Sequence, residues 1–159
     1  TTKGKSDELI SEREIIDNCI LTPKQWSTCK KYSHDLFKFG QKIANENGLI
    51  LVDTKYEFGI NNFGDIILID ELHTPDSSRY WVKHNYIDKM SSNEEPESID
   101  KEIVRKWVVK NCGNPYNLNN KIEIPNDLRL ELSSKYLQLY ELITGDELDS
   151  SKMNRINLK

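Results

Sequence analysis

The apolar residues of this chain change their spacing at Gly48. From Trp26 to Ile43 they recur every three or four positions, which is the spacing of one face of a helix. After Gly48, the stretches "LILVDTKYEFG" and "DIILID" are rich in β-branched and large apolar residues, as strands are. We therefore predict a long amphipathic helix that ends near Gly48 and is followed by strands. Gly40 inside this helix costs roughly 1 kcal/mol relative to alanine, so a close packing contact is expected there.

Capping pairs mark the helix starts. Ser11 and Glu14 have the spacing of a capping box, and so do Thr22 and Gln25, with Pro23 as the first helical residue. These signals predict a short helix after Ser11 and the start of the long helix at Pro23.

The two strand-like stretches are predicted to pair as an antiparallel hairpin. Their separator, "INNFGD", holds two asparagines and a glycine, residues that tolerate the positive φ of tight turns. The segment "HTPDSSRYW" at 73–81 contains a proline and small polar residues and is predicted to be an ordered loop. The segment "SSNEEPES" at 91–98 is predicted to be an exposed linker.

Two more helices are predicted after this linker. Ser98 or Asp100 can cap a helix through "KEIVRKWVVKN" that ends before Gly113. The last helix follows Pro125 and ends at Gly145, and its apolar stripe includes Tyr136. Helices and an antiparallel hairpin together predict the α+β class.

Length and charge narrow the classes of protein. A chain of 159 residues can form one domain with a buried core, predicted over 1–145, with a polar tail at 146–159. The chain has 22 basic and 26 acidic residues, whereas proteins that bind nucleic acids or anionic membranes normally carry a basic excess. It has no apolar run near the roughly 20 residues of a membrane span and no signal-peptide core. We expect a cytoplasmic protein with no nucleic-acid or membrane partner.

Charged residues alternate along the first predicted strand. Because side chains alternate across a strand, Asp53, Lys55 and Glu57 are expected to share one face. Asp70 ends the second strand, and a register that matches Asp70 to the Asp53 face would bring carboxylates together as magnesium requires. The simpler interpretation is a solvated sheet face.

A polar run directly after a buried strand points to a bound ligand. Arg79 at its end suits a phosphate or carboxylate, although it could equally pack on the rings of Tyr80 and Trp81. The polar residues of the run are Asp70, Glu71, Asp76, Ser77, Ser78 and Arg79.

These stretches also resemble a known family. "LILVDTKYEFG" followed by "ILIDELHTPDSSRYW" closely resembles the phosphoribosylaminoimidazole-succinocarboxamide synthases (SAICAR synthetases), and the likeness continues in "TTKGKSDELIS", "SIDKEIVRKWV" and "YLQLYELITG". This family of ATP-dependent ligases joins carboxyaminoimidazole ribonucleotide to L-aspartate through an acyl phosphate in purine biosynthesis. The resemblance implies ATP and Mg²⁺ as cofactors, with the ribonucleotide and L-aspartate as further ligands.

The resemblance also implies roles for individual residues. Glu57 and Asp70 would hold magnesium against the ATP phosphates, and Asp53 and Lys55 would act on the reacting carboxylates. Substrate would be bound by Asp76, Ser78, Arg79, Lys101 and Arg105.

Only the C-terminal part of the family is matched by this chain. The resemblance implies the C-terminal catalytic lobe of a two-lobe fold of the ATP-grasp or kinase-like kind, with the N-terminal half of the same protein as a partner that catalysis needs. Two alternatives stay open: a non-catalytic nucleotide-binding module and, with less support, a magnesium-dependent nuclease, which also holds its metal with acidic residues on a hairpin.

Overall fold

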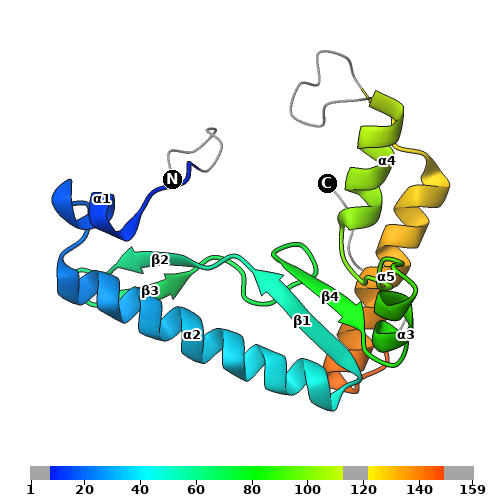
Figure 1. Cartoon of the computed structure of the whole chain (residues 1–159), viewed down its shortest axis with the longest axis horizontal. Coiled ribbons are helices and arrows are strands. Elements are labelled where there is room, and N and C mark those ends of the chain that lie inside the picture. Colours follow the sequence, from blue (N-terminus) through cyan, green and yellow to red (C-terminus); the bar gives the residue numbers. More distant parts are fainter. Residues whose placement is uncertain (1–7, 113–121, 149–159) are drawn as a thin grey trace. The chain divides into compact units, whose positions relative to one another are not determined.

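The computed structural model describes residues 8–112 and 122–148, which form an α+β structure of two compact units (Figure 1). Unit 1 comprises Thr1–Leu36 and Tyr56–Asp70, and unit 2 comprises Phe37–Lys55 and Glu71–Lys159. The predicted helix end at Gly113 and most of the predicted polar tail lie outside the described residues.

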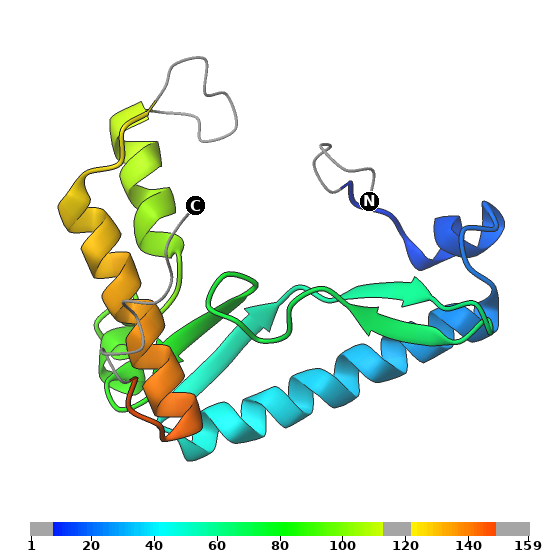
Figure 2. The same ribbon diagram turned by 180° about the vertical axis from the view of Figure 1, so that it is seen from behind.

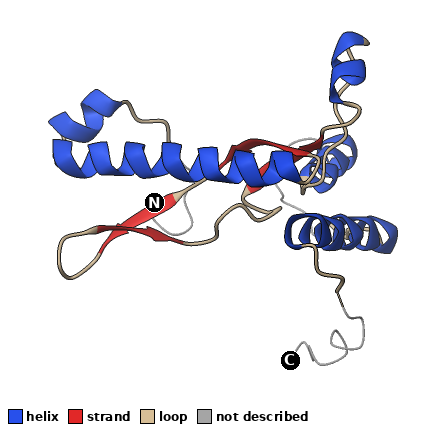
Figure 3. Cartoon of the chain, turned by 90° about the horizontal axis from the view of Figure 1, so that it is seen from below, coloured by secondary structure: helices blue, strands red, loops and turns tan. Residues whose placement is uncertain are grey.

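Unit 1 is built from helices and one hairpin. Its helices begin as predicted: the Ser11 side chain accepts from the Glu14 N–H, and the Thr22 N–H donates to Gln25 Oε1 at 2.9 Å. The elements are α1 (Glu12–Asp17), the first part of α2 (Pro23–Glu46), β2 (Glu57–Ile60) and β3 (Ile66–Ile69). Helix α2 continues without a break into unit 2 (Figure 3).

The hairpin of unit 1 is the pair β2–β3. Glu57 lies opposite Ile69, and the turn is held by Asn61, whose side-chain oxygen accepts from the N–H groups of Phe63 and Asp65 at 2.9 Å. Gly64 in this turn has φ +86°, the conformation for which glycine is suited. The predicted hairpin turn is therefore confirmed.

The predicted first strand is two strands. Strand β1 (Leu49–Thr54) pairs with β4 (Ser78–Val82) and not with β3, so the hairpin contains only the second half of the predicted strand. The prediction of a loop over 73–81 is correspondingly wrong at its end. Tyr80, Trp81 and Val82 are strand formers, but the strand begins with the polar residues Ser78 and Arg79, which are typical of a loop. A partner strand distant in sequence stabilises it.

Unit 2 has its core between β1, β4 and the helices. The two strands are antiparallel and lie side by side in both views (Figure 1, Figure 2), with Leu51 opposite Tyr80. Its other elements are α3 (Tyr86–Ser91), α4 (Glu102–Cys112) and α5 (Asn126–Thr144). The buried core cluster is Ala44, Leu49, Leu51, Tyr80, Ile99 and Leu139. The segment predicted as a linker is partly ordered, since Ser91 ends α3 and Ser98 bridges to Trp81.

The close contact predicted at Gly40 is confirmed. A Cβ atom at this position would collide with Cε1 of His73 and would lie 2.8 Å from Cδ2 of Leu51. Within unit 2, the glycine therefore lets the imidazole of His73 lie against the backbone of α2. The Tyr80 hydroxyl donates to the carbonyl of His73 at 2.7 Å and fixes the same loop.

The ends of the last two helices follow their sequence signals. The Asp100 carboxylate accepts from the N–H of Glu102 at 2.7 Å, so Asp100 is the capping residue of α4. Gly145 has φ +73° and ends α5. Among the residues that the structure describes, none of the helices is long and apolar enough to span a membrane.

Candidate active site

Asp53 and Arg79 form a bidentate ion pair across the strands of unit 2. The register places these residues directly opposite each other, because a bulge between Leu51 and Asp53 shifts the pairing by one residue. Arg79 Nε lies 3.0 Å from Asp53 Oδ2, and its terminal nitrogen donates to the same oxygen. Asp53 raises the pKa of Arg79 above its usual range, so this guanidinium is a permanent cation.

The predicted common face of Asp53, Lys55 and Glu57 is wrong. Asp53 belongs to β1, whereas Glu57 opens β2 in another sheet. Lys55 lies at the break between the strands, where its N–H donates to the carbonyl of Ser77 at 3.2 Å. Alternation applies within one continuous strand, so it does not extend across this break. A register that matches Asp70 to the Asp53 face does not form, because Asp53 pairs in the sheet of β1 and β4 and Asp70 follows β3.

The loop between β3 and β4 positions Asp76. Thr74 is its anchor, because its side-chain oxygen accepts from the N–H of Ser77 at 3.2 Å and its hydroxyl donates to the carboxylate of Glu71. Such side-chain-to-backbone bonds stabilise a turn without a ladder partner. The loop is therefore ordered, as predicted, over the part before β4.

Asp76, Lys101 and Arg105 line one pocket of about 370 Å³ in unit 2. Lys101 Nζ lies 3.0 Å from Asp76 Oδ1, and Arg105 donates to Glu102 at 3.0 Å. Val104 and Leu132, from α4 and α5, supply apolar wall. The structure thus brings together three of the residues for which sequence reasoning predicted substrate binding. Two cations beside a carboxylate can bind an anionic group and a hydroxyl at neighbouring positions.

Ser78 is placed differently from these residues. Its side chain is buried, with 4% of the residue exposed, and its hydroxyl donates to Thr54 Oγ1 at 2.8 Å. Ser78 therefore joins the ends of β4 and β1 next to Arg79. A direct contact between Ser78 and substrate stays a prediction.

Sequence reasoning assigned no site role to two residues near this pocket, Asp100 and Tyr136. Asp100 is 1% exposed, and burial is the main cause that raises its pKa, opposed by the Glu102 N–H and the charge of Arg79. Tyr136, expected only as part of an apolar stripe, lines the pocket beside Asp76. The signal available in the sequence was its hydroxyl, which the aliphatic residues at the other stripe positions lack.

Glu57 and Asp70 lie at the same end of the hairpin in unit 1. Glu57 is opposite Ile69, the residue that precedes Asp70. Asp70 has φ +66°, so its backbone leaves the strand geometry, and strand alternation no longer assigns its side chain to a face. In the described part of the chain, no group of three or more His, Cys, Asp and Glu side chains is placed to hold a metal ion.

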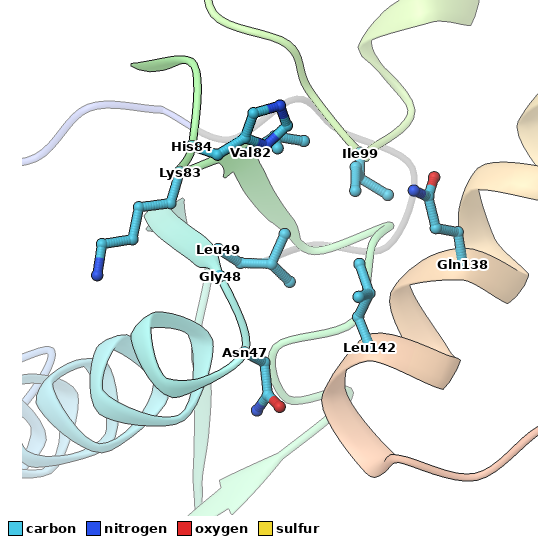
Figure 4. Close-up of a pocket in the computed structure, with 9 residues that line it drawn as sticks. All are labelled: Asn47, Gly48, Leu49, Val82, Lys83, His84, Ile99, Gln138 and Leu142. Atoms are coloured by element: carbon cyan, nitrogen blue, oxygen red, sulfur yellow. The ribbon is translucent and has the colours of Figure 1, made fainter. Parts of the chain in front are cut away.

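A second pocket of unit 2, of about 540 Å³, lies at the opposite end of β4 from Arg79. Leu49, Ile99 and Leu142 point into one space, whereas the side chain of Lys83 extends away from it (Figure 4). Its interior is therefore largely apolar, and we take the pocket with Asp76 as the candidate active site.

Comparisons with known proteins agree on one family. A family model described as SAICAR synthetase matches residues 1–121. The phosphoribosylaminoimidazole-succinocarboxamide synthase of Legionella pneumophila (strain Paris) is 46% identical over 146 residues, which cover 92% of this chain and 46% of the relative.

Solved structures give the same result. A SAICAR synthase from Saccharomyces cerevisiae complexed with SAICAR has a TM-score of 0.56 at 35% identity, covering 72% of this chain and 36% of its own. A type-2 SAICAR synthetase in complex with ADP has a TM-score of 0.63 over 90% of this chain and 47% of its own, and its 22% identity supports the fold alone. The chain thus spans about half the length of the Legionella relative and a smaller share of the yeast protein. Since the family model matches most of it, the chain belongs to the SAICAR synthetase family.

Proposed function

We propose that this chain is the C-terminal part of a ligase that condenses carboxyaminoimidazole ribonucleotide with L-aspartate, at the expense of ATP, to form SAICAR. The observation that carries the proposal is the pocket in which Asp76, Lys101 and Arg105 converge. It occurs in a chain 46% identical to a named synthase, and the yeast structure with 35% identity is a complex with SAICAR.

The pocket of unit 2 is proposed to bind the ribonucleotide. Lys101 and Arg105 supply positive charge for its phosphate, and Asp76 accepts hydrogen bonds from hydroxyl groups. Arg79 is proposed to bind substrate anions with the guanidinium that Asp53 now orients. The proposal includes a contact of Ser78 with substrate.

Asp53 and Lys55 are proposed to act on the reacting carboxylates. A ligase of this kind brings several anions together, so the amine of aspartate can attack only where cations offset the repulsion and hold the groups in line. The Lys55 ammonium is suited to this task, because its side chain is exposed at the strand break. The Asp53 carboxylate would accept a hydrogen bond from the amine of aspartate and so orient that amine. Arg79, the other partner of Asp53, holds the Asp53 carboxylate in place.

Glu57 and Asp70 are proposed to hold Mg²⁺ in unit 1. The ion is usually bound in proteins by one or two carboxylates, with phosphate oxygens and water completing its octahedron. Glu57 and Asp70 are two carboxylates at the same end of one hairpin, which matches this mode of coordination. When bound, the ion would neutralise charge on the ATP phosphates.

The whole protein is proposed to have two lobes of the ATP-grasp or kinase-like kind. The N-terminal half that relatives possess would bind the adenine of ATP and complete the enzyme. A cytoplasmic location stays a prediction.

The test is formation of SAICAR from ATP, Mg²⁺, L-aspartate and carboxyaminoimidazole ribonucleotide. We would measure it with the full chain alone and with the N-terminal half of the Legionella relative added as a separate polypeptide. Turnover in the mixture is the expected result. Turnover by the chain alone would refute the need for the other half, and ATP binding without turnover in the mixture would favour a non-catalytic nucleotide-binding module.

Matched variants of one hairpin locate the metal site. Glu57→Gln removes a carboxylate with little change in size and is expected to abolish turnover, because magnesium prefers charged oxygen ligands. Asp65→Asn is the control, since Asp65 lies in the turn at the far end of the hairpin. Equal activity of the two variants would contradict the assignment of Glu57.

A further inference from the structure

Tyr136 is a pocket residue to which the proposed roles assign no function. It lies on α5 and lines the pocket together with Asp76, Lys101 and Arg105. Both side chains line this pocket, and Asp76 is near enough to the Tyr136 hydroxyl to contribute to its raised pKa. The carboxylate pairs with the Lys101 ammonium at 3.0 Å, and the Tyr136 phenol is a second donor available to it in the same pocket.

The surroundings keep this phenol neutral. Burial is the main cause that raises the pKa of Tyr136, and the negative charges of Asp76, Asp100 and Glu71 raise it further. A neutral phenol can donate its proton to a carboxylate, whereas a phenolate would repel it. The Tyr136 hydroxyl therefore keeps a proton that it can donate.

An ionised carboxylate has about four lone-pair positions, so two protein donors leave room for a ligand. Lys101 has a long, exposed side chain that can turn toward a phosphate. Asp76 then loses this partner, and Tyr136 is the donor that stays beside it. The Tyr136 side chain has less freedom to turn away, because its rigid ring lines the pocket beside the apolar residues Val104 and Leu132.

We propose that Tyr136 is a positioning residue for the ribonucleotide: its hydroxyl holds the Asp76 carboxylate toward the pocket, so that the free lone pairs accept from a ribose hydroxyl. This inference rests on the proposed function. It assigns the sugar to the α5 side of the pocket and the phosphate to the cations Lys101 and Arg105.

The test is Tyr136→Phe, which keeps the ring and its packing and removes only the hydroxyl. Loss of a hydrogen bond to a charged group is expected to weaken ribonucleotide binding and to raise its KM about tenfold. The KM values for ATP and L-aspartate, and kcat, are expected to stay unchanged. Tyr140→Phe is the matched control, because Tyr140 lies one turn further on the same helix and is 42% exposed.

A double variant separates positioning from packing. If Tyr136 acts through Asp76, Tyr136→Phe weakens binding no further in a chain that already carries Asp76→Asn. Additive losses would overturn the inference, as would a Tyr136→Phe chain that binds as tightly as the Tyr140→Phe chain. If either of these results is found but the wild-type chain still binds the ribonucleotide and forms SAICAR in the mixture, the inference fails and the proposed function stands. If the wild-type chain neither binds the ribonucleotide nor forms SAICAR in the mixture, the proposed function fails and the inference fails with it.

Discussion

The ion pair of Asp53 and Arg79 owes its geometry to one bulge in β1. Both side chains are 49% exposed, so the pair contributes about 0 to 1 kcal/mol to stability. The pair contributes more to orientation than to stability, because a bidentate contact fixes the plane of the Arg79 guanidinium. The lysine of the Asp76–Lys101 pair is less constrained, since an ammonium offers a point charge on a flexible stem.

Gly40 is the residue at which a single added atom should matter most for stability. Gly40→Ala gains about 1 kcal/mol in helix propensity, but overpacking costs roughly 1 to 3 kcal/mol, so we expect a net loss of about 1 kcal/mol. The new Cβ would meet His73 and the buried Leu51. Urea unfolding measures the effect. A second substitution, His73→Ala, should restore part of the loss, and a stabilised Gly40→Ala chain would contradict the close approach of His73 to α2.

At the scale of elements, helix starts follow local signals and strand partners do not. The capping pairs of α1 and α2 lie within three residues of each other, so the chain forms them without distant help. The partner of β1 is β4, which begins 24 residues after β1 ends. Helix α4 depends on both local and distant residues. Its capping residue Asp100 is close to the helix in the sequence, but residues of the core bury it.

This burial predicts how the stability of α4 depends on pH. The pKa of Asp100 is raised from 3.8 in the folded chain, so the folded state holds the proton more tightly than the unfolded state. Its contribution to stability is complete below pH 3.8 and is lost as pH rises through the folded pKa. Asp100→Asn keeps an oxygen for the Glu102 N–H and cannot ionise.

The free energy of unfolding of Asp100→Asn, relative to wild type, should therefore increase as pH rises from about 3.8. Urea unfolding at several pH values measures this difference, with the exposed Asp88→Asn in α3 as the control. A difference that is constant with pH would show that burial does not shift the titration of Asp100.

At the scale of the whole molecule, the proposed ligands divide between the two units. The proposed magnesium ligands Glu57 and Asp70 belong to unit 1, and the pocket with Asp76 belongs to unit 2. The proposed ligase chemistry needs both sets of residues. Binding of one substrate depends only on the residues that contact it.

This division predicts the effect of removing magnesium. EDTA is expected to abolish SAICAR formation and to leave binding of the ribonucleotide to the chain unchanged, because neither proposed metal ligand lines its pocket. Isothermal titration calorimetry with and without EDTA measures the binding. Ribonucleotide affinity that falls with EDTA would instead place the ion among the groups that bind this substrate.

The sequence by itself determined the local features and the family. Capping boxes, the turn at Asn61 and the glycine ends of α2 and α5 depend on residues a few positions apart, and propensity and side-chain hydrogen bonds act at that range. The stretches "LVDTKYEFG" and "TPDSSRYW" identified the SAICAR synthetase family, because a family motif consists of residues that are close together in the sequence.

Only the tertiary structure decided which strands pair and which side chains meet. The break at Lys55 and the pairing of β1 with β4 replaced the predicted common face of Asp53 and Glu57. The position of Tyr136 beside Asp76 depends on the packing of α5 near a loop 60 residues earlier. Such contacts join segments distant in sequence, and the free energy that selects them comes from burial of a shared core, which no local pattern encodes.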